Sequence, residues 1–409
     1  MIRTQRSLVI ALCALGLAVL GLGQTSMLGA PVLRPIRSPG RPAAAPDFEA
    51  IARLIVDEAA RVKENDSVLI TGDPSKIPLM EAIAVQVAKK GAFSHMVLDS
   101  PAVQKRILAE VPGQYLATAN PMTLAEIKTI DVSIGLSPVQ DPAGLARFPE
   151  ERVALTRKAS QEINESISTR PLRTVSLGNP IMPTEAAARF YGVPLVELAA
   201  RFWEAVQTPH AQIEAPGARV RDAFASGREV RVRTMAGTDL RLRLAGSRVG
   251  FSDGQIHQTP VDRPEQVWLP AGEVYTTPDV ASVNGVVVVP AAEYRGIKIR
   301  DLRLTFENGR LTRIEAPQNA DALEGALARS SGDKDLFSFI DVGVNPNSRM
   351  IRNAAYFTSE MSGMVSLGIG QAPWADSPNT SDFAQEFFVP NATLEVDGKA
   401  IVRDGSLAI

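Results

Sequence analysis

Cysteine is almost absent from this sequence of 409 residues, which contains one cysteine, Cys13, and three histidines, His95, His210 and His257. Cys13 lies in an apolar run, Leu8 to Leu22, that we expect to be removed from the mature chain. A mature chain without cysteine forms no disulfide and has neither a catalytic thiol nor a thiolate metal site.

An excess of basic charge is also missing. Lysine and arginine together number 43 against 45 acidic residues, which gives a formal net charge of −2. No basic field is available to attract a phosphate backbone, so nucleic acid is not expected as a partner. The length and the hydrophobic content of 45% predict a globular protein with a large core and two domains.

The N-terminal segment is typical of an export signal. Arg3 and Arg6 precede the apolar run, which is short for a membrane span, and small residues precede Gln24. We therefore predict a signal peptide over residues 1–23 and a periplasmic or extracellular protein. An uncleaved signal that anchors the chain in a membrane is the alternative. The Pro- and Ala-rich residues 24–46 are typical of a flexible tether.

Residues 47–215 alternate between short apolar runs and amphipathic segments. Such alternation predicts a parallel sheet with helices on its faces, that is, an α/β domain. The expected helices are 48–63, 78–90 and 151–167, and the expected strands are 68–73, 96–99, 131–136 and 174–178. Gly72 and Gly178 follow strands, but no glycine-rich nucleotide-binding motif accompanies them, so we interpret both as turn residues.

Residues 216–409 have a different pattern, which predicts a β-rich α+β domain. Two pairs of alternating segments are typical of β-hairpins, 229–233 with 239–244 and 302–306 with 311–314. The remaining expected elements are a buried strand over 286–289, a helix over 320–328 and closing strands over 392–396 and 400–402. We place the domain boundary near residue 215.

The segment from Trp268 to Pro278 contains the first candidate site residue. Ala271 and Gly272 permit a tight turn before Glu273, which stands at the start of a strand that Pro278 is expected to end. A carboxylate in this position is typical of a metal ligand or a general base. A turn glutamate exposed to water is the alternative.

A set of short motifs resembles the aminopeptidase T-like, or thermophilic-type, metallopeptidases. The motifs are Thr238-Asp-Leu, Leu269-Pro-Ala-Gly-Glu-Val-Tyr, Ser282-Val-Asn-Gly, Asn308-Gly, Gly343-Val-Asn-Pro, Ser359-Glu-Met-Ser-Gly, Ser381-Asp and Val396-Asp-Gly. The resemblance implies an α/β domain followed by a β-rich domain that carries two divalent metal ions, in a homodimer around an enclosed cavity. It also implies carboxylate and histidine ligands, a nearby tyrosine and a bridging water that the ions activate against a peptide.

Carried over residue by residue, the resemblance retains the acids of this site. Glu273 matches the first glutamate of the family. Asp341 is the best counterpart of the second, although an ungapped count places Phe339 there. Glu360 matches an acidic position just before the first ligand histidine. At a later His-x-Asp motif this chain reads Ala-Gln-Glu, which retains a carboxylate in Glu386.

The histidines of the family are missing. Ser366 occupies the position of the first one, or Met364 if the count is shifted, and Gln371 lies where an aromatic hydroxyl is expected. His257 is the one histidine close in sequence to the Glu273 loop. We expect it to be a loop histidine without a ligand role, and a ligand role is the alternative.

The retained residues predict an oxygen-only site. Glu273, Asp341 and Glu386 are the expected metal ligands, and Glu273 or Glu360 is expected to handle the proton of the attacking water. The resemblance implies Zn, Co, Mn or Mg, and oxygen donors favour Mg²⁺, Ca²⁺ or Mn²⁺ over Zn²⁺. Without an ion the acids would repel one another or recruit a basic partner. Arg349 and Arg352 are candidates for that partner, with surface charge as the alternative.

Three functions remain open. The first is an exported aminopeptidase of this family that acts on peptide or small-molecule substrates through an altered, carboxylate-rich metal site. The second is a catalytically inactive family member that acts as a binding or scaffold protein. The third is iron-dependent cleavage of aromatic rings, an activity that the resemblance implies for some relatives of this fold. Such iron sites normally require two histidines and a carboxylate.

Overall fold

The computed structural model describes residues 46–136, 148–178, 182–257, 264–351 and 354–409. The expected signal peptide and nearly all of the tether lie outside these ranges. No helix within them is both long and apolar enough to cross a membrane.

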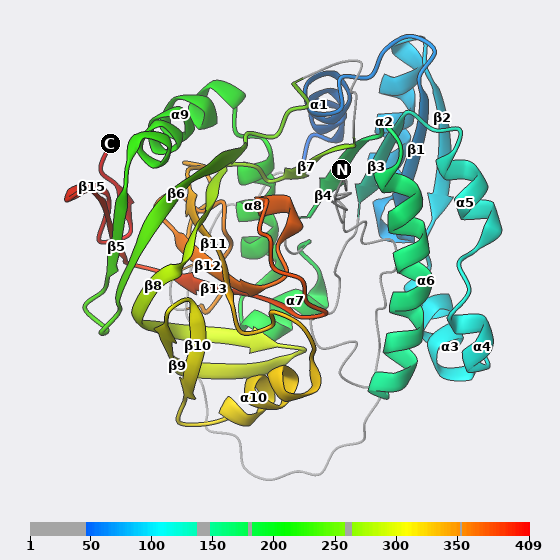
Figure 1. The fold of residues 1–409 in the computed structure, drawn as a ribbon. Coiled ribbons are helices and arrows are strands. Elements are labelled where there is room, and N and C mark those ends of the chain that lie inside the picture. The colour runs from blue at the N-terminus through cyan, green and yellow to red at the C-terminus, as the bar shows by residue number, and fades with distance from the viewer. Residues whose placement is uncertain (1–45, 137–147, 179–181, 258–263, 352–353) are drawn as a thin grey trace, which may run out of the picture.

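The N-terminal half is built on a parallel sheet, as predicted (Figure 1). Its strand order is β2-β1-β3-β4-β7, and every neighbouring pair is parallel. The strands are β1 (Ser67–Gly72), β2 (Phe93–Leu98), β3 (Val132–Leu136), β4 (Arg173–Leu177) and β7 (Glu265–Leu269). Ile70, Ile134 and Val175 are fully buried in the three central strands, which explains why these segments are apolar runs.

Helices surround this sheet. The expected helix 48–63 is divided into α1 (Phe48–Arg53) and a π-helical turn over Leu54–Ala59. The other helices of the described N-terminal half are α2 (Ile77–Lys89), α3 (Pro101–Glu110), α4 (Gly113–Leu116), α5 (Pro121–Ile127), α6 (Glu150–Ser168), α7 (Glu185–Tyr191), α8 (Leu195–Val206) and α9 (His210–Ser226). α2 packs on β1 and β2, whereas α9 lies against β6 (Asp239–Ser252) and β8 (Glu273–Tyr294) of the other sheet (Figure 1).

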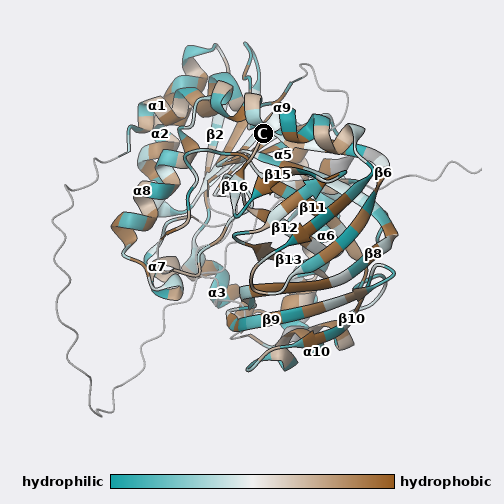
Figure 2. Cartoon of the chain, turned by 90° about the vertical axis from the view of Figure 1, so that its left-hand side faces the viewer, coloured by the Kyte–Doolittle hydropathy of each residue, from teal (hydrophilic) through white to brown (hydrophobic). Residues whose placement is uncertain are grey.

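The C-terminal half is an antiparallel sheet that curves through the β-rich domain. Its strand order is β13-β12-β11-β8-β6-β5-β14-β15-β16, with β9 beside β8 and β10 beside β9. Bands of hydrophobic and hydrophilic residues alternate along β6 and β8 (Figure 2), as expected for strands with one face in the core. The elements are β5 (Glu229–Arg233), β6 (Asp239–Ser252), β8 (Glu273–Tyr294), β9 (Ile297–Glu307), β10 (Arg310–Glu315), α10 (Ala320–Arg329), β11 (Phe337–Gly343), β12 (Val365–Gly370), β13 (Ala384–Val389), β14 (Thr393–Val396), β15 (Lys399–Arg403) and β16 (Ser406–Leu407).

The prediction that Pro278 ends the strand after Glu273 is wrong. β8 continues through Pro278 to Tyr294 and contains the expected strand 286–289. Pro278 faces Leu244 of β6 next to a register shift between Leu244 and Val249. An irregular stretch of the ladder tolerates a residue without an N–H, so proline does not interrupt the strand here.

One strand of the N-terminal sheet comes from the C-terminal half of the chain. β7 lies after the expected boundary near residue 215, yet it pairs with β4 at the edge of the N-terminal sheet. Residue 215 itself lies inside α9. The division into domains at 47–215 and 216–409 stays a prediction.

A buried ion pair connects β4 to the segment before β1 and leads to the first testable prediction. Arg173 Nη2 lies 2.7 Å from Asp66 Oδ1, and Arg173 Nη1 donates to the carbonyl of Arg61 at 2.7 Å. Arg173→Met removes one member of a buried pair, so it should lower the free energy of unfolding by about 3–5 kcal/mol. The shift of the urea unfolding midpoint measures this loss.

An exposed pair on the other sheet provides the control. Arg231 and Asp239 are 2.7 Å apart, but their side chains are 35% and 49% exposed. Arg231→Met should therefore cost less than about 1 kcal/mol. Equal losses in the two variants would show that the Arg173 pair has no special structural role.

Candidate functional site

Glu273 begins β8 where this strand lies between β6 and β11, opposite Ser252 and Gly343. The preceding Gly272 has a φ of +123°, and a Cβ atom there would lie 2.8 Å from the Cβ of Asn345. Only glycine fits this turn without displacing the neighbouring loop. The Glu273 side chain is buried and accepts a hydrogen bond of 2.8 Å from Ser359 Oγ. The alternative of an exposed turn glutamate is therefore wrong.

Three adjacent strands bring Asp341, Ser366 and Glu386 together. Asp341 on β11 faces Ser366 on β12 in the antiparallel ladder, and β13 carries Glu386. Ser366 Oγ donates to Glu386 Oε1 at 2.6 Å and lies 3.5 Å from Asp341 Oδ2. The residue at the expected histidine position thus lies between the two acids and connects them through its hydroxyl.

Glu360 reaches the same region from the loop between β11 and β12. Its side chain is buried, and Oε1 accepts hydrogen bonds from Thr358 Oγ1 at 2.7 Å and from Ser348 Oγ at 3.1 Å. Two neutral hydroxyls thereby hold the carboxyl group in place.

Burial and mutual repulsion raise the pKa values of the acids around Glu273. Burial is the main cause in each case, and the charge of Glu273 adds to it. The pKa of Glu360 and that of Glu386 rise to about 8, and the pKa of Asp341 also lies well above its ordinary value. All three therefore interact electrostatically with Glu273, which is the centre of the group that we call the acid cluster: Glu273, Asp341, Glu360 and Glu386.

The acid cluster suits a hard divalent cation in the chemistry of its donors. Asp341 Oδ1 and Glu360 Oε2 are buried and have no hydrogen-bond partner within the described part of the chain. Such oxygens favour either a proton or a cation. The acids of the cluster are spaced more widely than the ligands of a single ion. Within the described residues, the one group with three ligand atoms within 4.8 Å of one another is His210, Glu214 and Asp253, and it contains none of these acids.

Asn345 is a positioning residue that the sequence analysis missed. It is fully buried, and its amide nitrogen donates to the carbonyls of Ala205 at the end of α8 and Ala271 before Glu273. Its amide oxygen accepts from Thr208 Oγ1 at 2.8 Å, and its backbone N–H donates to the Glu360 carbonyl at 3.0 Å. The side chain of Asn345 thus joins the α/β domain to the turn before Glu273, and its backbone N–H holds the loop that carries Glu360.

Aromatic residues cover one side of the acid cluster. Phe339, the ungapped counterpart of the second family glutamate, packs against Trp374 with ring centroids 4.6 Å apart, and Trp374 also contacts Tyr275. Burial and the charge of Glu273 raise the pKa of Tyr275, and burial and the charge of Glu360 raise that of Tyr356. These two phenols lie near the acids, whereas the expected aromatic hydroxyl is replaced by Gln371. Tyr275 was identifiable from sequence because residues two apart on a strand share a face.

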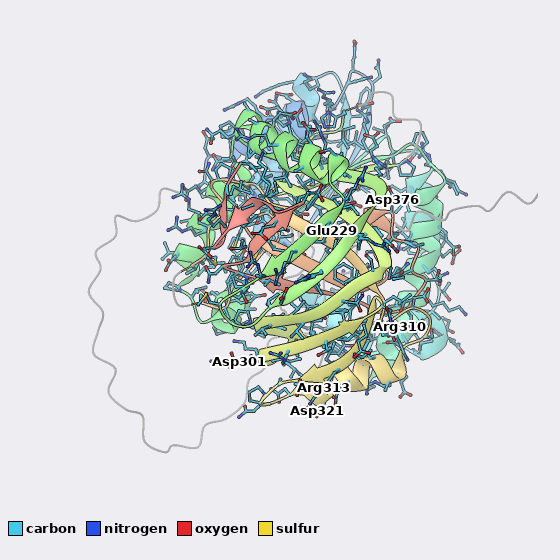
Figure 3. All side chains as sticks on the ribbon, turned by 60° about the vertical axis from the view of Figure 1, so that its left-hand side comes forward. Glu229, Asp301, Arg310, Arg313, Asp321 and Asp376 are labelled. Atoms are coloured by element: carbon cyan, nitrogen blue, oxygen red, sulfur yellow. The ribbon has the colours of Figure 1, made fainter. Side chains whose placement is uncertain are left out.

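The other candidate residues lie apart from the acid cluster. Arg349 is exposed and donates to the carbonyl of Pro346, which agrees with its interpretation as surface charge. Arg352 lies outside the described residues. Met364 is buried in an apolar cluster with Met361. The exposed charges labelled in Figure 3 belong to the outer surface of β5, β9, β10, α10 and the loop after β12 and are distinct from the buried acids.

The chain is similar to a known protein family and to a protein of known sequence. The family described as Thermophilic metalloprotease (M29) matches residues 45–339. Of the acid cluster, only Glu273 lies inside that match. Aminopeptidase AmpS from Bacillus subtilis (strain 168) is 32% identical over 101 residues, and the matched segment covers 24% of each protein.

Two solved structures share the fold. Wild-type AmpT from Thermus thermophilus superimposes with a TM-score of 0.71 at 18% identity, over 88% of this chain and 99% of that one. The structure of 2,5-dihydroxypridine dioxygenase from Pseudomonas putida KT2440 gives a TM-score of 0.54 at 16% identity, over 88% of this chain and 95% of that one. At these identities both similarities establish the fold alone.

Asn345→Leu tests whether this amide holds the two loops. The change removes the partner that Asn345 provides to the carbonyl of Ala271 and to the backbone N–H of Asn347 in the interior, so we expect a loss of about 3 kcal/mol in the free energy of unfolding. Asn284→Ala is the control, because Asn284 is exposed and water can replace its hydrogen bonds. A loss no larger than that of the control, measured by urea unfolding, would contradict the assignment.

The raised pKa values predict how pH acts on the protein after treatment with a chelator. Between about pH 4.5 and 8 the folded state keeps protons on Glu360 and Glu386 that the unfolded state releases, so stability falls as pH rises through this range. Each retained proton contributes a slope of up to about 1.4 kcal/mol per pH unit. The melting temperature should therefore decrease from pH 5 to pH 8.

Glu360→Gln should flatten this pH dependence, because the amide accepts the same hydrogen bonds and carries no titratable proton. Glu307→Gln alters an exposed acid on β9 and should leave the slope unchanged. Identical slopes in the wild type and Glu360→Gln would show that Glu360 is ionised in the folded protein at neutral pH.

Proposed function

Because the chain belongs to the Thermophilic metalloprotease (M29) family, we propose that it is an exported metallohydrolase that releases N-terminal amino acids from peptides. The observation that supports this proposal is the acid cluster, in which buried carboxylates surround Glu273 and two of their oxygens have no described partner. The similarity to aminopeptidase AmpS over 101 residues supports the same direction.

In this proposal Glu273, Asp341 and Glu386 hold a divalent ion. When bound, such an ion lowers the pKa of a water molecule and polarises the scissile carbonyl. The oxygen-only donors favour Mn²⁺ or Mg²⁺ over Zn²⁺, with Co²⁺ as a further candidate from the family. The altered site thus replaces a histidine of the family with Ser366, whose hydroxyl orients Glu386 by a hydrogen bond of 2.6 Å.

Glu360 is the proposed proton carrier. Its pKa of about 8 lies close to neutral pH, where a group exchanges protons most effectively. Thr358 and Ser348 fix one of its oxygens and leave the other available for a proton. Glu273, held by Ser359, is the alternative carrier in the same proposal.

A neighbouring pocket has a suitable lining for a peptide side chain. It has a volume of about 370 Å³ and is lined in part by Met350, Met361, Met364, Arg349 and Ser348. The methionines adapt to apolar groups of different shape. Ser348 also donates to Glu360, so one side chain of the pocket lining contacts the acid cluster.

A catalytically inactive binding or scaffold protein is the second candidate function. The specific observation that favours it is the replacement of ligand histidine by Ser366, together with the wide spacing of the acids. Iron-dependent ring cleavage has weaker support, because no histidine lies among the described residues of the acid cluster. Export and homodimer formation stay predictions, which cell fractionation and light scattering test.

Metal analysis and hydrolysis of aminoacyl anilides by the full mature chain separate the two candidates. We expect bound Mn²⁺ or Mg²⁺ and turnover that depends on the ion. Glu273→Gln removes the central charge and should lower kcat/KM by about 100-fold or more, with less bound metal. Glu307→Gln, the exposed control on β9, should behave as the wild type.

Absence of bound metal and of hydrolysis in the presence of Zn²⁺, Co²⁺, Mn²⁺, Mg²⁺ or Ca²⁺ would overturn the enzyme proposal in favour of the binding protein. Equal activity in Glu273→Gln and the wild type would instead remove Glu273 from the mechanism.

A further inference from the structure

A second group of metal-binding side chains lies outside the acid cluster. His210 and Glu214 are one turn apart at the start of α9, so both side chains lie on the same helix face. Asp253 approaches them from the segment that follows β6. One ligand atom from each of these three residues lies within 4.8 Å of the other two.

The separations of these atoms suit a small ion. His210 Nε2 is hydrogen-bonded to Asp253 Oδ2 at 3.0 Å and lies 3.5 Å from Glu214 Oε2. Two ligands at about 2.0–2.1 Å from a tetrahedral ion are about 3.3 Å apart, which falls between these values. A mixed imidazole and carboxylate set is typical of Zn²⁺ and related first-row ions.

Asp253 has the supporting contacts of a metal ligand. Its side chain is only 2% exposed, and its other oxygen, Oδ1, accepts from the backbone N–H of Gln255 at 3.1 Å. His257 Nε2 lies 2.7 Å from Asp253 Oδ2 and is not a member of the group of three. Hydrogen bonds of this kind from outside the ligand set orient a coordinating carboxylate.

The space at this group is small. His210 and Asp253, but not Glu214, line a pocket together with Leu269 and Ala271, and the room inside it is about 20 Å³. That volume holds an ion or one water molecule and is too small for an organic ligand.

The position of the group connects it to Glu273. Asp253 directly follows Ser252, whose carbonyl accepts from the N–H of Gly272 at 2.8 Å and whose register partner is Glu273. An ion bound by Asp253 and by the start of α9 would therefore fix the turn that carries Glu273.

We propose that His210, Glu214 and Asp253 form a separate structural site for a Zn²⁺-type ion, with His257 as a hydrogen-bonding partner of Asp253 outside the ligand set. The three ligands leave one position of a tetrahedral ion for water. The ion stabilises the junction between α9, the end of β6 and the Glu273 turn.

The test uses the full mature chain carrying Glu273→Gln, which weakens metal binding by the acid cluster. After chelator treatment, Zn²⁺ binding is measured by calorimetry, and Co²⁺ binding by its visible ligand-field absorption. We expect one ion per chain and a rise in melting temperature with Zn²⁺. Adding His210→Ala removes a ligand and should weaken binding by more than about 100-fold, which exceeds the loss of an outer partner.

Two further histidine variants distinguish a ligand from an outer hydrogen-bonding partner and from an unrelated histidine. His257→Ala changes a side chain that is 62% exposed, so the fold is retained, and binding should weaken by about 10- to 100-fold. His95→Ala is the matched control, because His95 lies on β2 and pairs with Glu126 far from this group in the fold, and binding should be unchanged. Absence of Zn²⁺ binding, or equal affinity in the His210→Ala and His95→Ala proteins, would overturn the proposal.

Discussion

The burial of several carboxyl groups around Glu273 is the constraint on which the rest of this site depends. Acids that are held away from water and close to one another cannot all be ionised, so the fold must supply protons, cations or hydroxyl donors. Ser359, Thr358 and Ser348 supply hydroxyls to the glutamates, and Ser366 supplies one to Glu386. Asp341 Oδ1 and Glu360 Oε2 keep capacity for a proton or an ion. The acid cluster is thus a place where charge can be exchanged, which is what hydrolysis requires.

The strand order and one loop of the fold together place the residues of the acid cluster near one another. The adjacent strands β11, β12 and β13 carry Asp341, Ser366 and Glu386, and β8 carries Glu273 on the other side of β11. Glu360 is brought in by a loop whose backbone carbonyl is bound by Asn345. The same asparagine binds α8 and the turn before Glu273, so the α/β domain takes part in shaping a site whose acids all belong to the C-terminal half of the chain.

Much of the fold and part of the site followed from sequence. Apolar runs identified β1 to β4, and alternation identified the hairpins β5–β6 and β9–β10, because these strands bury both faces or one face. The sequence did not identify β7, β11, β12 or β13 individually. Glu273, Asp341, Glu360 and Glu386 were expected near one another, and the charge of Glu273 helps to raise the pKa values of the other three, whereas their roles as ligands and proton carriers stay predictions. The role of Ser366 and that of Asn345 were not predictable, since both depend on cross-strand register and domain contact rather than on local pattern. The prediction that Pro278 ends a strand was wrong for a similar reason. The irregular pairing with β6 that accommodates this proline depends on two strands and cannot be read from one.

The return of β7 to the N-terminal sheet has a consequence for how the chain matures. This edge strand is synthesised only after α9 and the long strands β5 and β6, so the parallel sheet lacks its last member while most of the chain is still emerging. Until Glu265–Leu269 is available, β4 presents an open edge, which is a template for mispairing. The N-terminal sheet is therefore completed only when the segment that leads into the turn at Gly272 is available, so the two halves reach their final form together.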